Sequence, residues 1–141
     1  MILVIDGQGG GIGRSLVEML KEAFPNEEIG AVGANAIATA NMVKGSPSFA
    51  VTGENGVIYN CSQADVIVGP IGIALANAMH GEITPAMANA ISSSRAHLVL
   101  VPMNHCHAYI CGIEEKRITE YLQEAVNIIG QKLELRGAKK C

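Results

Sequence analysis

The chain has 141 residues, a formal net charge of −3 at pH 7, and 49% hydrophobic against 16% charged residues. This composition predicts one globular domain with enough apolar side chains for a core. The acidic balance, with 4% aromatic residues and no Trp, argues against a nucleic-acid partner. Met1 leads into an apolar segment without a basic leader or a long apolar run, so we expect a cytoplasmic protein with no membrane partner. Its four cysteines are then expected to be reduced thiols.

A glycine-rich segment follows the first predicted strand and opens the first predicted helix. Residues 2–5 are apolar, and apolar side chains recur every fourth residue from Ile12 to Phe24, which predicts a strand, a turn and a helix. The free N–H groups of the first helical turn and the helix dipole favour an anion there, and glycines let a phosphate approach the backbone. The expected phosphate-binding residues are Gly7, Gln8, Gly9, Gly10, Gly11, Ile12 and Gly13.

The glycine spacing separates the known phosphate-binding motifs. GxGxxG does not fit, and without a GK[ST] ending a P-loop is disfavoured. GxxxGxG fits at Gly7, Gly11 and Gly13, and in this the segment resembles the cofactor loop of short-chain dehydrogenases and reductases. That resemblance implies an NAD(P)-like cofactor. The alternative is a glycine turn that only lets the helix pack tightly on the strand.

A second strand is expected over residues 29–34, joined to the first by a right-handed parallel crossover. Dinucleotide folds usually place an Asp or Glu at the end of this strand to bind the ribose hydroxyls. Here Gly33, Ala34 and Asn35 occupy those positions, so the acid is missing. Asn35 could bind a ribose or cap a helix over residues 36–43, and the cap is favoured. The missing acid argues against NAD.

Two short apolar runs, 49–51 and 57–60, flank a connection that contains Asn and Gly. They predict a hairpin, or a strand followed by a functional loop. Gly53 and Asn55 are candidate ligand contacts, and Glu54 is a candidate acid or base. The alternative for Asn55 and Gly56 is ordinary turn chemistry.

The next predicted strand, beginning at Val66, ends in a second glycine-containing loop. Ligands of doubly wound folds bind at the carboxyl ends of strands, so this loop should face the same ligand as the first. Between Val66 and Ser94 only Glu82 is charged, which favours burial against the core or against a second copy in a homodimer. Glu82 is the first candidate acid or base, although the dipole of a helix starting at Thr84 also explains it. The candidate contacts in this loop are Gly69, Pro70, Ile71 and Gly72.

After a helix over 85–94 and a strand over 97–101, polar and thiol side chains gather. Asn104 is a candidate ligand contact, and Cys106 is a candidate nucleophile beside His105 and His107. With Cys111, these side chains could bind zinc, but no CxxC or HxxxH pair is present. We therefore assign no metal. The alternative is a loop followed by a strand over 108–113.

The last helix is expected over residues 117–129, followed by a polar, mobile tail from 132 to 141. The domain is then residues 1–131. Tyr121 is followed four positions later by Ala125, so the YxxxK active site of short-chain dehydrogenases is missing.

Five segments together resemble an uncharacterised bacterial domain family, a domain of unknown function of about this length. They are the opening VIDGQGGGIG, the TGEN at 52–55, the GPIGI at 69–73, the GEITP at 81–85 and the PxNxC at 102–106. The resemblance implies that these segments form the site, without implying an activity.

The predicted fold class is α/β: a Rossmann-like three-layer α/β/α domain with a mainly parallel sheet and helices on both faces. The predicted function is binding of a nucleotide, an NAD(P)-like dinucleotide or another phosphorylated small molecule across the two glycine loops. The alternatives are a non-catalytic, ligand-sensing homodimer and a metal-dependent site at residues 105–111.

Overall fold

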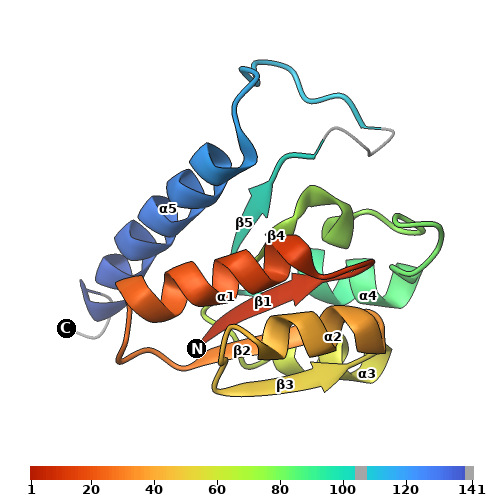
Figure 1. Ribbon diagram of the computed structural model, residues 1–141, viewed down its shortest axis with the longest axis horizontal. Helices are drawn as coiled ribbons and strands as arrows, with labels where there is room; N and C mark the ends of the chain where they lie inside the picture. Colours follow the sequence, from red (N-terminus) through yellow and green to blue (C-terminus); the bar gives the residue numbers. More distant parts are fainter. Residues whose placement is uncertain (104–107, 139–141) are drawn as a thin grey trace.

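The computed structural model describes residues 1–103 and 108–138, in which strands and helices alternate along the chain (Figure 1). The strands are β1 (Ile2–Asp6), β2 (Ile29–Gly33), β3 (Phe49–Thr52), β4 (Val66–Pro70) and β5 (His97–Val101). The helices are α1 (Gly11–Ala23), α2 (Ala36–Val43), α3 (Glu54–Cys61), α4 (Pro85–Ser92) and α5 (Ile118–Ala138), with a short 3-10 helix η1 (Ile71–Ala74).

The strands form one parallel sheet in the order β3-β2-β1-β4-β5. The central strand β1 pairs with β2 on one side and with β4 on the other, so the direction of winding reverses between β1 and β4. In open parallel sheets the carboxyl ends of two such strands border the crevice where ligands bind. The topology therefore places the glycine loop after β1 beside the loop after β4.

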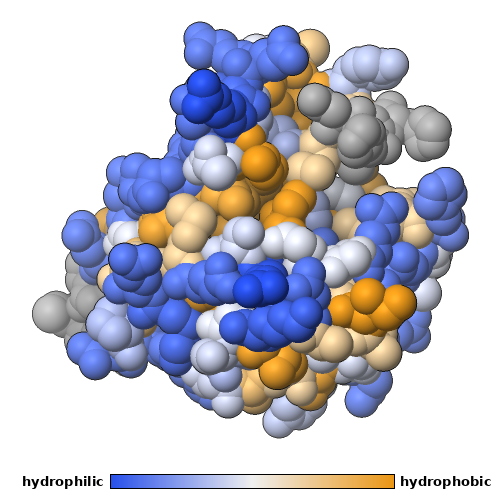
Figure 2. All heavy atoms as spheres, viewed as in Figure 1, coloured by the Kyte–Doolittle hydropathy of each residue, from blue (hydrophilic) through white to orange (hydrophobic). Residues whose placement is uncertain are grey.

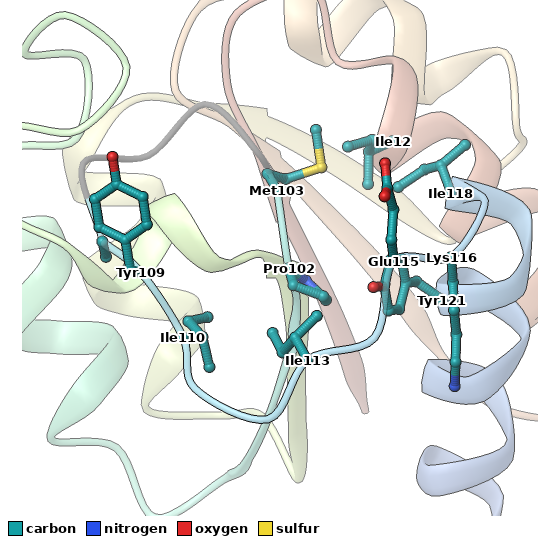
Figure 3. Close-up of a pocket in the computed structure, with 11 residues that line it drawn as sticks. Ile12, Pro102, Met103, Tyr109, Ile110, Ile113, Glu115, Lys116, Ile118 and Tyr121 are labelled. Atoms are coloured by element: carbon teal, nitrogen blue, oxygen red, sulfur yellow. The ribbon is translucent and has the colours of Figure 1, made fainter.

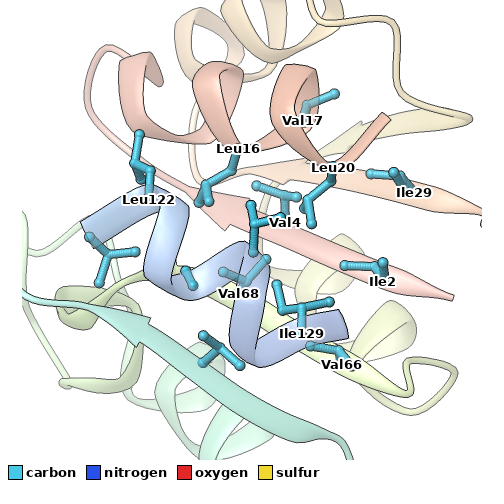
Figure 4. Close-up of a cluster of buried hydrophobic side chains, with 14 of the residues drawn as sticks. Ile2, Val4, Leu16, Val17, Leu20, Ile29, Val66, Val68, Leu122 and Ile129 are labelled. Atoms are coloured by element: carbon cyan, nitrogen blue, oxygen red, sulfur yellow. The ribbon is translucent and has the colours of Figure 1, made fainter. Parts of the chain in front are cut away.

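Hydrophobic side chains alternate between the two faces of the sheet and build two cores. Ile2 and Val4 of β1 face one core, and Leu3 and Ile5 face the other, as the twofold periodicity of a strand requires. Helices α1, α2 and α5 cover the first core, which Figure 4 shows between α1, α5 and the sheet. Helices α3 and α4 cover the second. This arrangement confirms the predicted Rossmann-like α/β/α fold.

The connection after β3 differs from the predicted hairpin. The second apolar run is helical, because α3 begins at Glu54 directly after Gly53, whose φ of 98° turns the chain. Val57 is buried against the sheet from this helix. The alternative prediction, a strand followed by a loop, places β3 correctly. The connection between β3 and α3, however, consists of Gly53 alone.

The C-terminal part of the chain also differs from the prediction. The described residues from 108 to 113 form an irregular segment with a turn, so the prediction of a strand there is wrong. Helix α5 continues past Ile129 to Ala138, so as far as this residue the expected polar tail is helical. Near the end of α5, the guanidinium of Arg136 donates hydrogen bonds to the carboxylates of Glu27 at 2.6 Å and Asp65 at 3.1 Å, at the amino ends of the strands. Among the described residues, no helix is both long and apolar enough to cross a membrane.

Candidate functional site

The glycine loop is held from within by Asp6, the last residue of β1. One oxygen of its carboxylate accepts the N–H of Gly7 at 2.8 Å, and the other accepts the N–H of Gly13 at 2.7 Å. Burial raises the pKa of Asp6, the two backbone hydrogen bonds oppose this rise, and the nearby Glu82 carboxylate adds to it. The N–H of Gly13, one of the groups in the first turn of α1 that we expected to bind a ligand, therefore donates to a side chain of the protein itself.

A second carboxylate, that of Glu82, fastens the loop to the end of β2. Its Oε1 accepts the N–H of Gln8 at 3.0 Å and the side-chain amide of Asn35 at 2.6 Å. The Asn35 amide also donates to the carbonyl of Gln8, and its oxygen accepts the N–H of Ala38 as the N-cap of α2. The predicted cap is confirmed. The Asn35 donor is therefore engaged by the protein itself.

Three of the loop glycines are required by their neighbours. A Cβ on Gly7 would lie 2.5 Å from the sulfur of Met79, and one on Gly13 would lie 2.5 Å from the sulfur of Met42. Gly10 has a φ of +71°, and its Cβ would lie 2.6 Å from the carbonyl oxygen of Ala38. Close packing of helices and loops around the turn accounts for these three positions.

The other two loop glycines face open space. A Cβ on Gly9 or Gly11 would meet no atom within 4 Å, and neither residue has a positive φ. Both are exposed. Among the described residues, no acceptor receives a hydrogen bond from the N–H groups of Gly9, Gly11 or Ile12. The loop therefore presents, at the start of α1, three N–H donors that no other described residue engages.

Ile12 lines a crevice of about 780 Å³ at the carboxyl ends of β1 and β4, whereas Gly9 and Gly11 lie beside it in the chain and are not among the described lining residues. Its size lies in the range of small-molecule sites. The loop between β4 and α4 forms one wall, and Ile12 and Met103 contribute to the rest. The described lining residues are Asp6, Gln8, Ile12, Pro70, Gly72, Leu75, Ala76, Asn77, Ala78, Met79, His80, Met103 and Ala108.

Unusual backbone conformations concentrate around this crevice. Within residues 1–103 and 108–138, five non-glycine residues have positive φ, and four of them, Gln8, Asn77, Met79 and His80, line the crevice. Such conformations cost about 1–3 kcal/mol each and tend to occur at functional sites. Backbone hydrogen bonds within the loop between β4 and α4 hold Asn77, Met79 and His80 in place. One of them joins the N–H of Asn77 to the carbonyl of Ile83 at 2.7 Å.

The predicted residues of the β3–α3 connection have structural contacts. Glu54 Oε2 accepts the hydroxyl proton of Thr84 at 2.5 Å, and Thr84 in turn caps α4 through the N–H of Met87. Gly53 is the N-cap of α3, and Asn55 is exposed in its first turn. None of Gly53, Glu54 and Asn55 lines the crevice.

The predicted loop after β4 is divided between packing and the crevice. A Cβ on Gly69 would lie 2.2 Å from the carbonyl oxygen of Ile5, so this glycine permits close approach of β4 to β1. Pro70 and Gly72 line the crevice, whereas Ile71 does not. The charge-poor region around this loop buries Ile73, Ile83 and Met87 in the second core of the same chain.

A second hollow of about 620 Å³ adjoins the crevice and shares Ile12, Met103 and Ala108 with it. Figure 3 shows Ile12 and Ile118 on one side of it and Ile110 and Ile113 on the other. In Figure 2 hydrophobic side chains gather between the start of α5 and the end of β5. The crevice therefore has an apolar extension beside it.

Asn104, His105, Cys106 and His107 lie outside the described residues. Of the proposed zinc ligands the structure describes Cys111, which is an exposed free thiol. No group of three or more metal-ligating side chains occurs within residues 1–103 and 108–138. Cys61 is also free, and its burial raises the pKa of the thiol to about 11.

Several residues of the site were missed from the sequence. Asp6 carried a usable signal, because an acid that ends a buried strand just before a glycine loop is placed to accept that loop's N–H groups. Asn41, whose amide donates to the carbonyl of Gly9 at 3.0 Å, looked like an ordinary helix residue. Met79 and His80 carried no signal, because their positive φ depends on the fold of the loop.

A five-stranded parallel sheet with a ligand-sized crevice at its switch point defines a Rossmann-like α/β domain. The family model described as "Domain of unknown function (DUF3842)" matches residues 1–134, and the chain belongs to this family. No curated protein and no solved structure matches the chain. The predicted membership of a domain family of unknown function is therefore confirmed.

Proposed function

We propose that this domain binds a nucleotide or a related phosphorylated small molecule at the switch-point crevice. The observation that carries the proposal is the pair of open glycines, Gly9 and Gly11, whose N–H groups lack partners among the described residues. Packing and backbone conformation explain the neighbouring glycines and leave these two unexplained. A phosphate that approaches the backbone closely would explain both the missing side chains and the free donors.

The surroundings favour a phosphate attached to a larger group. The side chain of Asn35 accepts the N–H of Ala38 and donates to the carbonyl of Gln8. The C=O of Gln8 and the N–H of Gly9 belong to one trans peptide, in which these two groups point in opposite directions. The N–H of Gly9 therefore points away from Asn35. The crevice that Ile12 lines is bordered mostly by apolar side chains, with His80 as the only basic side chain among the described lining residues. It suits the body of an organic phosphate better than a free inorganic ion.

The proposal is tested with a thermal-shift screen of the purified protein against NAD, NADP, ATP, GTP, FMN, coenzyme A and sugar phosphates. A ligand at a hundred times its dissociation constant should stabilise the fold by about 2.7 kcal/mol, which is a shift of several degrees. Gly11→Asp should abolish the response, because it places a carboxylate in the open space at the phosphate position. An acid in the first turn of α1 should leave the fold intact.

Gly11→Asn is the matched control, since it adds a side chain of the same shape without the charge. We expect Gly11→Asn to retain more of the response than Gly11→Asp. If no compound shifts the wild type, or if both variants respond as the wild type does, the phosphate site is not at this loop.

A second candidate is a ligand-sensing homodimer without catalysis. The observation that favours it is the exposure of two apolar side chains on either side of the edge strand β3: Ile37 of α2 is 73% exposed and Tyr59 of α3, on the opposite face of the sheet, is 64% exposed. The Val66–Ser94 region is a weaker candidate for the dimer face, because its large side chains are buried within the chain.

A further inference from the structure

We infer that Glu82 supplies the carboxylate that binds the ribose hydroxyls of the ligand. The inference rests on the proposed nucleotide site and names its substrate class as a ribonucleotide. In dinucleotide-binding folds an acid at the end of the second strand serves this purpose, and here that position holds Asn35. Glu82 reaches the same place from the loop that follows β4, with its Oε1 2.6 Å from the Asn35 amide nitrogen.

The carboxylate is held in position before any ligand arrives. Oε1 receives two donors, the Asn35 amide and the N–H of Gln8, and it would lie 3.0 Å from a Cβ on Gly7. The acid thus lies over the first glycine of the loop, on the side of Asn35, and is not among the described residues that line the crevice. Among the described residues, Oε2 of Glu82 accepts no hydrogen bond. One oxygen anchors the side chain and the other remains available.

The two kinds of group at the loop require different ligand chemistry. The N–H groups of Gly9, Gly11 and Ile12 only donate, so they suit a phosphate. The Glu82 carboxylate only accepts and would repel a phosphate, so the part of the ligand beside it must offer neutral donors. A ribose carries two adjacent hydroxyl donors next to its phosphate. A ribonucleotide therefore satisfies both groups at once.

The experiment compares binding of ADP, GDP, CDP and UDP with that of their 2′-deoxy counterparts by isothermal titration. A hydroxyl donated to a charged acceptor should make the ribonucleotide bind at least about tenfold more tightly. Glu82→Ala should reduce this preference to about one. Glu82→Gln keeps an acceptor oxygen for Gln8 and Asn35 and should retain part of it. Glu54→Gln removes a carboxylate elsewhere on the same edge of the sheet and should leave the preference unchanged.

The outcomes separate this inference from the proposed function. Equal binding of both sugar forms by the wild type overturns the assignment of Glu82, and so does an undiminished preference in Glu82→Ala. In either case the phosphate site stands if Gly11→Asp abolishes binding. If none of the eight nucleotides binds the wild type, the inference fails, and the thermal-shift screen decides separately whether the phosphate site stands.

Discussion

At the scale of single residues, Asp6 has the least expected role. Its carboxylate is 4% exposed and is bound by two backbone N–H groups from opposite ends of the glycine loop. Burial disfavours the charged form, and the neighbouring Glu82 carboxylate disfavours it further, so the pKa of Asp6 is raised from 3.8. The residue that shapes the loop is therefore also a source of pH-dependent stability.

The direction of that dependence follows from proton binding. Because the pKa of Asp6 is higher in the folded chain than in the unfolded chain, the folded state binds more protons between the two values. Stability then falls as pH rises from about 4 through the raised pKa. We expect the free energy of unfolding of the wild type, relative to Asp6→Asn, to decrease over this interval.

Urea unfolding of both proteins from about pH 4 to about pH 7 measures this difference. The comparison cancels the titration of carboxyl groups that do not interact with Asp6, because the variant lacks only the one acid. A difference that stays flat, or that grows with pH, would show that the hydrogen bonds from Gly7 and Gly13 outweigh the cost of burial.

At the scale of elements, the glycine loop contains two kinds of glycine. Gly10→Ala should destabilise the protein by at least about 1 kcal/mol, because a Cβ at positive φ is strained and this one would overlap the backbone of Ala38. Gly9→Ala should change the stability little, since its Cβ would enter open space. Thermal unfolding of the pair checks this, and an equal loss in both variants would contradict the distinction.

Local signals predicted the elements whose ends are set by nearby residues. Asn35 and Thr84 both accept N–H groups three residues ahead, so the starts of α2 and α4 could be read from the sequence. The start of α3 could not, because the Asn55-Gly56 pair is typical of a hairpin turn. There the fold prevails: Val57 is buried in the second core, and Glu54 bonds a residue thirty positions away.

The candidate site was predictable in its backbone and less so in its side chains. The strand, glycine turn and helix could be identified, since their signals are consecutive in the sequence. The contacts of Glu82 with Gln8 and Asn35 join three separate loops. Which side chains meet there depends on the strand order, and no local pattern contains that order.

At the scale of the whole molecule, the exposed apolar side chains of α2 and α3 predict self-association. Sedimentation velocity should detect a dimer, and the double variant Ile37→Lys, Tyr59→Lys should shift it toward the monomer by placing charges in an apolar interface. Gln131→Lys, an exposed position on α5, is the control for added charge. A wild-type monomer, or a dimer that persists in the double variant, would exclude an interface formed by these side chains.

The hydrogen bonds that hold the walls of the crevice would affect the thermodynamics of the proposed binding. Side chains of this same chain, those of Asp6, Asn35, Asn41 and Glu82, hold the glycine loop, and backbone hydrogen bonds hold the opposite wall. The conformational entropy of ordering both walls is thus lost when the chain folds, and little remains to be lost when a ligand arrives. Weak intrinsic contacts could then give useful affinity to the proposed ligand, because it would meet walls that are already in place.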